Sequence, residues 1–80
     1  MSGGDRRAQV LVLSPTRELA MQISEDMRKY AKYKTGISVA AVYGGAPMDA
    51  QITQLRTANI VIGTPGRVMD HMRRRTLRLD

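Results

Sequence analysis

The chain has 80 residues, which is enough for one small domain with a modest core. It contains no Phe, Trp or Cys, so the core must be built from aliphatic side chains, Met and Tyr, and disulfides and thiolate metal sites are excluded. Thirteen Lys and Arg against seven Asp and Glu give a formal net charge of +6, which favours a polyanion such as nucleic acid as partner, although solubility alone also explains it. No segment is long and apolar enough to span a bilayer and no signal peptide is visible, so we expect a soluble protein in the cytoplasm or another intracellular compartment.

The first predicted element is a strand at Val10–Leu13. Its residues are all apolar and do not alternate with polar ones, which is typical of a parallel strand covered on both faces, so we expect a central position. Residues 1–8 are expected to form a flexible linker, since Met1–Gly4 reads as a start methionine followed by small linker residues. The ordered domain is therefore predicted to comprise residues 9–80.

A helix is predicted from Arg17 to about Lys34, and Gly36 ends it. Its apolar residues recur at helical spacing, at Leu19, Ile23, Met27, Tyr30 and Ala31. Acidic residues come early and basic residues late, an order that suits the helix dipole. The basic cluster at residues 28–34 could contact nucleic acid, but a solvated helix end explains it as well.

The second strand is predicted at Ile37–Tyr43, where Ser38 and partial alternation favour a less covered, edge position. Gly44 and Gly45 end the strand and let the backbone approach a partner closely, although a plain turn also explains such a pair. After them a second helix can open at Pro47, with Met48, Ile52 and Leu55 on one face.

A third strand at Asn59–Gly63 is predicted to turn into a helix that runs from about Gly66 to Arg75. Thr64 can cap this helix, and Pro65 suits its first turn, where a missing N–H costs nothing. The same pattern, Ser/Thr-Pro-x-Arg, follows the first strand at Ser14–Arg17. Two apolar strands thus end in the same kind of turn.

The last helix is expected to bury an apolar side marked by Val68, Met69 and Met72. His71 has no Cys, His or carboxylate at metal-ligand spacing, so we interpret it as a surface residue and predict neither a metal site nor a catalytic residue. Arg73–Arg75 closes the helix, and its cations are interpreted as structural first and as nucleic-acid contacts second.

Strands that alternate with helices predict an α/β fold, a three-stranded parallel sheet in the order β-α-β-α-β-α with right-handed crossovers. Because the first and third strands are apolar throughout and the second is not, we predict the strand order 1-3-2. The loops that follow the strands then share one edge of the sheet, where helix N-termini and two arginines can bind phosphates. Such an edge suits a sugar-phosphate backbone better than one nucleoside triphosphate, unless the Ser/Thr-Pro-x-Arg turns only cap helices.

Three motifs carry a family resemblance. Pro15-Thr16-Arg17-Glu18-Leu19-Ala20, Gly44-Gly45 and Thr64-Pro65-Gly66-Arg67 match, in identity, order and spacing, motifs Ia, GG and Ib of the DEAD-box ATP-dependent RNA helicases. From about residue 9 to residue 80 the chain resembles the middle of the first RecA-like, P-loop NTPase-like, domain of that family.

The resemblance implies binding of single-stranded RNA through its sugar-phosphate backbone, without sequence preference. The residues that it implicates are Pro15, Thr16, Arg17, Gly44, Gly45, Thr64, Pro65, Gly66 and Arg67. Direct contacts to phosphate or ribose are expected from six of them, Thr16, Arg17, Gly45, Thr64, Gly66 and Arg67, whereas Glu18 is expected to order its loop.

The chain also departs from the family. It has no Gly-x-x-x-x-Gly-Lys-Ser/Thr loop and ends before the Asp-Glu-Ala-Asp strand, so we expect no ATP hydrolysis from these residues, although the family uses ATP and Mg²⁺. Our leading interpretation is an RNA-binding segment with no cofactor or catalysis of its own. The alternatives are one piece of a larger ATPase, and a structural or self-assembling fragment that pairs with a second copy through the open edge of Val10–Leu13.

Overall fold

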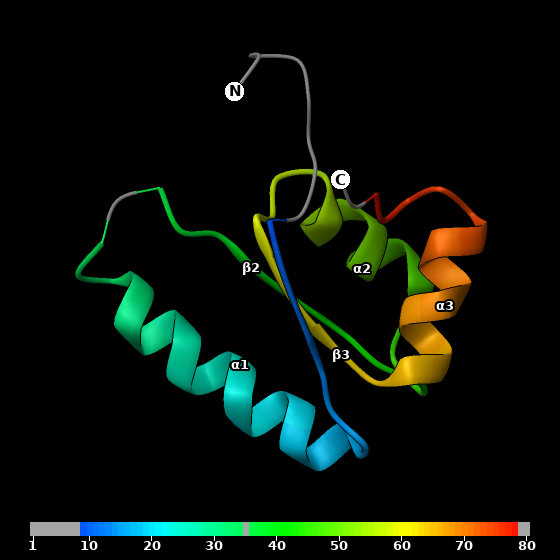
Figure 1. Ribbon diagram of the computed structural model, residues 1–80, viewed down its shortest axis with the longest axis horizontal. Helices are drawn as coiled ribbons and strands as arrows, with labels where there is room; N and C mark the ends of the chain where they lie inside the picture. Colours follow the sequence, from blue (N-terminus) through cyan, green and yellow to red (C-terminus); the bar gives the residue numbers. More distant parts are fainter. Residues whose placement is uncertain (1–8, 35, 79–80) are drawn as a thin grey trace.

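The computed structural model describes residues 9–34 and 36–78. Strands and helices alternate along them (Figure 1): β1 (Val10–Leu13), α1 (Arg17–Ala31), β2 (Val39–Val42), α2 (Met48–Leu55), β3 (Ile60–Gly63) and α3 (Pro65–Arg73). The predicted order of elements is confirmed. The linker expected at residues 1–8 lies outside the described residues.

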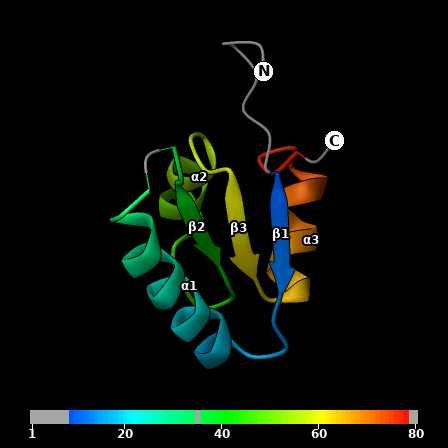
Figure 2. The same ribbon diagram turned by 60° about the vertical axis from the view of Figure 1, so that its left-hand side comes forward.

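The strands form one parallel sheet in the order β1-β3-β2, as predicted. Figure 2 shows the three arrows pointing the same way, with β3 between its neighbours. The prediction of a central position for Val10–Leu13 is wrong for the described chain, because β1 lies at an edge, with Val10 47% and Leu13 56% exposed. An apolar run without alternation shows that a strand is apolar on both sides, but not that it has two neighbours.

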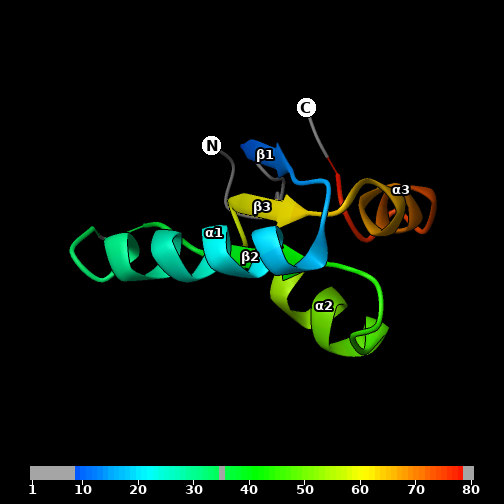
Figure 3. The ribbon, with the colours of Figure 1, turned by 90° about the horizontal axis from the view of Figure 1, so that it is seen from below.

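Helices cover both faces of the sheet, with α1 on one side and α2 and α3 on the other (Figure 3). The larger core cluster lies on the side of α2 and α3 and contains Ala40, Val42, Leu55, Ala58, Val61, Val68 and Leu77, with Leu11 packed against it. Ala41 and Ile62 belong to the opposite face, because side chains alternate along a strand, and they are buried together with Ala20 of α1. β2 is an edge strand, as predicted, but it is well covered on both faces.

The buried faces of α1 and α3 differ from the predicted ones. α1 ends at Ala31 rather than Lys34, and it buries Ala20 and Ser24, while Leu19 of the predicted stripe is 44% exposed. α3 buries Val68 together with His71, whereas the side chains expected to be buried beside Val68, Met69 and Met72, are 55% and 43% exposed. The interpretation of His71 as a surface residue is therefore wrong, since none of its surface is exposed.

The region between β3 and α3 is tightly packed where β3 ends. A Cβ on Gly63 would stand 2.5 Å from the carbonyl oxygen of Val42 and 2.7 Å from Val68 Cγ2, so only glycine fits there. This contact sets how closely α3 can follow β3. Within residues 9–34 and 36–78, none of the helices has the length and apolar character that a bilayer crossing requires.

Candidate nucleic-acid interface

The carboxyl ends of the strands bring the three predicted motifs to one edge of the sheet, at the arrowheads in Figure 2. Backbone hydrogen bonds hold the loops together there. Ser14 N–H donates to the carbonyl oxygen of Gly63 (2.9 Å), and Thr64 N–H donates to that of Val42 (3.1 Å). All nine predicted site residues lie in these loops or in the first turns of α1 and α3.

The loop between β1 and α1 is ordered by its own hydroxyl groups. Thr16 is the N-cap of α1, and its Oγ1 accepts from Leu19 N–H (3.2 Å). Ser14, which is 1% exposed, donates from Oγ to the carbonyl oxygen of Thr16 (3.2 Å). Pro15 therefore lies before the helix, and Arg17 is its first residue, with an exposed side chain. This turn differs from the one before α3, where the proline itself is the first helical residue.

The glycine pair after β2 meets Arg17. Gly45 has φ +86°, a left-handed conformation that glycine adopts without strain. A Cβ at this position would also lie 3.0 Å from Arg17 Nη1, so the guanidinium of Arg17 rests against the Gly45 backbone. Gly44 has open space where a Cβ would be. Arg17 and Gly45 belong to two different motifs, 28 residues apart in sequence, which the fold brings into contact.

The N-terminus of α3 offers backbone N–H groups to a ligand. Thr64 occupies the N-cap, but its side chain makes no capping hydrogen bond, in contrast to the prediction. Val68 N–H donates to the Thr64 carbonyl oxygen (2.9 Å), whereas in the described part of the chain the N–H groups of Gly66 and Arg67 bond no acceptor. Apart from its chain neighbours and the backbone of its own helix, no atom of the described residues lies within 4 Å of where a Cβ on Gly66 would be. An anion could therefore reach both N–H groups.

The Arg67 side chain is half-buried and connects α3 to the loop after β2. Its Nη1 donates to the carbonyl oxygen of Ala46 (3.2 Å) and to Gln51 Oε1 (3.3 Å). Neither Gln51 nor Ala46 was predicted as a site residue from the sequence. The only sequence signal for Gln51 was its position four residues before Leu55, which places a polar residue on the predicted apolar face of α2.

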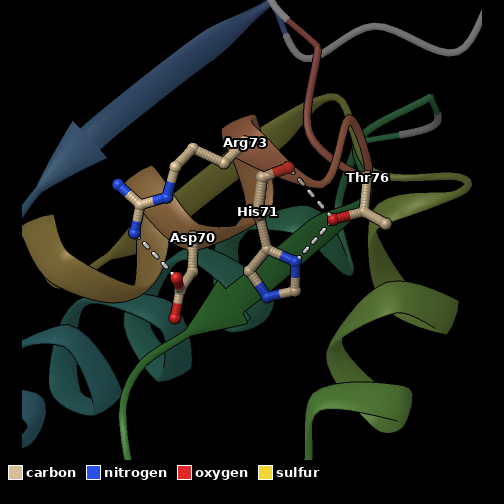
Figure 4. A network of polar contacts seen from close by, with 4 residues as sticks. All are labelled: Asp70, His71, Arg73 and Thr76. Carbon is tan, nitrogen blue, oxygen red and sulfur yellow. Dashed lines mark hydrogen bonds and ion pairs between the residues drawn. The ribbon is translucent and has the colours of Figure 1, made fainter.

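A buried histidine lies behind this arginine. His71 Nε2 is 2.8 Å from Gln51 Oε1, and the Thr76 hydroxyl is within hydrogen-bond distance of both His71 Nδ1 (2.8 Å) and the His71 carbonyl oxygen (3.2 Å). Figure 4 shows the contacts with Thr76, beside the Arg73–Asp70 ion pair of 2.8 Å.

The surroundings of His71 favour its neutral form. Burial lowers the pKa of His71 below 6.5, the positive charges of Arg67 and Arg74 lower it further, and Asp70 opposes them. A neutral ring that donates from Nε2–H to Gln51 accepts at Nδ1 from the Thr76 hydroxyl. In this state the single hydroxyl hydrogen of Thr76 goes to Nδ1 and not to the His71 carbonyl oxygen.

Chemically, the groups at this edge suit an anion. Among the described residues, no group of three or more His, Cys, Asp or Glu side chains comes together that could hold a metal ion. The available groups are backbone N–H groups at helix N-termini, hydroxyl groups and two guanidinium groups, which are the usual donors to phosphate oxygens.

The comparison with known proteins identifies the family. A family model described as DEAD/DEAH box helicase matches residues 2–80. The chain belongs to this family. Among curated proteins, it is 51% identical over 76 residues to the ATP-dependent RNA helicase DeaD of Klebsiella pneumoniae and 51% identical over 73 residues to DeaD of Escherichia coli K12. These matches cover 94% and 90% of the chain but 12% of each relative.

Solved structures of DEAD-box proteins share the fold. A hypothetical ATP-dependent RNA helicase from Sulfolobus tokodaii superposes with a TM-score of 0.80 at 41% identity, over 88% of this chain and 21% of that one. A DEAD-box protein from Methanococcus jannaschii gives 0.79 at 41% identity, over 94% of this chain and 20% of that one. The predicted RecA-like architecture is thereby confirmed, and the chain spans about a fifth of the length of these two proteins.

Proposed function

We propose that this chain binds the sugar-phosphate backbone of single-stranded RNA, as an RNA-binding part of an ATP-dependent RNA helicase. The RNA-binding loops contain Pro15, Thr16, Arg17, Gly44, Gly45, Thr64, Pro65, Gly66 and Arg67, and the direct contacts come from the six of these residues named above. The observation that carries the proposal is the N-terminus of α3, where the N–H groups of Gly66 and Arg67 bond no acceptor in the described residues and open space lies beside Gly66.

The first turns of the helices rank the loops as phosphate sites. α1 has Glu18 and α2 has Asp49 in the first turn, whereas the first turn of α3 has no acidic residue. A carboxylate at a helix N-terminus competes with an incoming phosphate for the same positive potential. The strongest phosphate contact is therefore at α3, and Arg17 beside Gly45 provides a second one.

Binding of this kind has no sequence preference, because the donors are assigned to phosphate and sugar oxygens, which carry no sequence information. ATP and Mg²⁺ enter only with other parts of the helicase. The 80 residues contain no Gly-x-x-x-x-Gly-Lys-Ser/Thr segment, so we propose that they bind RNA without nucleotide and do not hydrolyse ATP by themselves. An RNA partner also suits an intracellular location, which stays a prediction.

The test is a titration of a fluorescent single-stranded RNA of uniform sequence, without nucleotide, at several salt concentrations. For single strands, the slope of log K against log salt is about −0.7 per neutralised phosphate, so two to four contacts predict a slope of roughly −1.5 to −3. An affinity that does not change with salt would contradict the proposal. So would a strong preference for one base sequence.

Matched variants separate the loops from diffuse charge. Arg17→Gln combined with Arg67→Gln should weaken binding about tenfold or more, because a preorganised guanidinium loses little entropy on binding phosphate. Replacing Arg73, Arg74 and Arg75 by Gln should weaken it less, although it removes more charge, since Arg73 is already paired with Asp70. The reverse ranking would assign binding to the terminal arginines.

A second candidate function is self-assembly, and the exposure of β1 is the observation that favours it. Within the described residues, β1 pairs only with β3, so its outer edge has free N–H and C=O groups beside exposed Val10 and Leu13. An uncharged edge strand without proline is a template for pairing with another strand. A second copy could extend the sheet about a two-fold axis.

A further inference from the structure

We propose that Gln51 is a positioning residue that fixes the Arg67 guanidinium in the orientation that binds a backbone phosphate. This inference rests on the proposed function, and it assigns a role to a side chain outside the three motifs. Gln51 is 2% exposed, so it cannot itself be a principal RNA contact.

Gln51 connects three elements through one amide group. Its Oε1 accepts from Arg67 Nη1 (3.3 Å) and lies 2.8 Å from His71 Nε2, and both of these partners belong to α3. Its Nε2 donates to the carbonyl oxygen of Tyr43 (2.8 Å), where β2 ends. A carbonyl oxygen has two lone pairs, so both acceptor positions of Oε1 are used.

The partners determine which way the amide points. The Tyr43 carbonyl oxygen requires a donor, and Arg67 offers only donors. A flipped amide would set its NH₂ group against Arg67 and its oxygen against the Tyr43 oxygen. The neutral His71, which donates from Nε2–H, holds the same orientation from behind. The acceptor for Arg67 is therefore fixed before any ligand arrives.

The consequence for Arg67 is a defined set of remaining donors. One hydrogen of Nη1 goes to Gln51 and the other to the Ala46 carbonyl oxygen. Within residues 9–34 and 36–78, Nε and Nη2 bond no acceptor, so the fork formed by Nε–H and Nη2–H remains for two oxygens of one phosphate. Without Gln51, the guanidinium keeps the Ala46 carbonyl oxygen as acceptor but loses the one that fixes its orientation, so more of the side chain must be ordered on binding.

The test uses Gln51→Met, which keeps the length and the apolar stem but loses the acceptor. RNA affinity should fall about 5- to 30-fold, in line with the rotamer entropy of an arginine side chain. Gln54→Met is the matched control. Gln54 lies one turn further along α2, and its Oε1 also accepts from an arginine, Arg28 (3.4 Å), which is not at the loop edge. The second donor to this oxygen is the backbone N–H of Ala41 (3.2 Å), where Gln51 has His71. This control should change RNA affinity less than twofold.

A merely structural role is excluded by repeating the substitution in an Arg67→Gln background. If Gln51 acts through Arg67, Gln51→Met should cost less than twofold there, because the group that it positions is gone. An equal loss in both backgrounds would overturn the inference. If Arg67→Gln alone leaves RNA affinity unchanged, the contact assigned to Arg67 under the proposed function fails. If Arg67→Gln weakens RNA binding but Gln51→Met does not, only the role of Gln51 is overturned.

A measurement on the unmodified chain covers the case in which Gln51→Met does not fold. His71 is the single histidine of the sequence, so its ring nitrogens give unambiguous NMR signals. The free chain should show the Nε2–H tautomer, and RNA should shift the Nε2 signal, since Arg67 and His71 share the Gln51 oxygen. An Nε2 signal unaffected by saturating RNA would overturn the proposal.

Discussion

Gly66→Ala should stabilise the fold and weaken RNA binding, and this opposition of effects tests the proposed phosphate site. Gly66 is helical in α3, and among the described residues no atom outside its own helix and its chain neighbours lies within 4 Å of the position that the new methyl group would take. Replacing glycine by alanine at a compatible site stabilises a protein by about 0.4–1 kcal/mol, because the unfolded chain loses conformational freedom. For a domain of this size, that gain corresponds to a rise in Tm of roughly 2–8 °C.

The expected loss of affinity follows from the same open space. The methyl group would stand beside the Gly66 and Arg67 N–H groups, where the phosphate must approach. Losing a hydrogen bond to a charged group costs about 1.5–3 kcal/mol, which corresponds to roughly 10- to 150-fold weaker binding. The salt slope should also become less negative by about 0.7, the contribution of one phosphate.

Thermal melting followed by circular dichroism and RNA titration by fluorescence anisotropy measure the two effects. Thr53→Ala is a suitable control, since the Thr53 side chain is exposed on α2 and its hydroxyl donates to the Asp49 carbonyl oxygen of its own helix (3.1 Å). It should leave RNA affinity unchanged. A stabilised Gly66→Ala protein that binds RNA as tightly as the unmodified chain would refute the phosphate site at α3.

The remaining predictions concern pH and assembly. Because the folded-state pKa of His71 lies below that of the unfolded chain, the unfolded state binds more protons, and the free energy of unfolding should fall as pH drops below about 6.5 and through the folded-state pKa. Urea unfolding from pH 7.5 to pH 5 should show this fall, and a His71→Gln protein that shows the same fall would assign it to other groups. Bound phosphate offsets the charge of Arg67, so RNA should raise the pKa of His71 in an NMR titration, and an unchanged pKa would contradict contact with that arginine. Light scattering over a concentration series should show self-association through β1 that Val10→Lys reduces, since Val10 is 47% exposed and its replacement costs little core; a monomer at high concentration would contradict edge pairing.

Much of the fold follows from local sequence. The apolar runs of β1 and β3, the Gly44-Gly45 turn and the Thr-Pro pair before α3 are signals within a few residues, and the alternation of strands with helices implies a parallel sheet. Once the sheet is parallel, the loops after the strands must share one edge. The positions of the nine site residues were predictable for this reason, before any contact between them was known.

The contacts within the site were decided by the tertiary structure. Helical periodicity gives the spacing of side chains along α1 and α3 but not the face that meets the sheet, so His71 was expected outside and Met69 inside. His71 and Gln51 can be buried because partners on other elements satisfy their polar atoms. His71 of α3 contacts Gln51 of α2 and Thr76 of the segment after α3, and Gln51 donates to the Tyr43 carbonyl oxygen at the end of β2. Arg17 meets Gly45, and Arg67 meets Ala46, across more than 20 residues of chain. Such pairings depend on where the folded backbone brings donors and acceptors together, and no pattern of neighbouring residues encodes them.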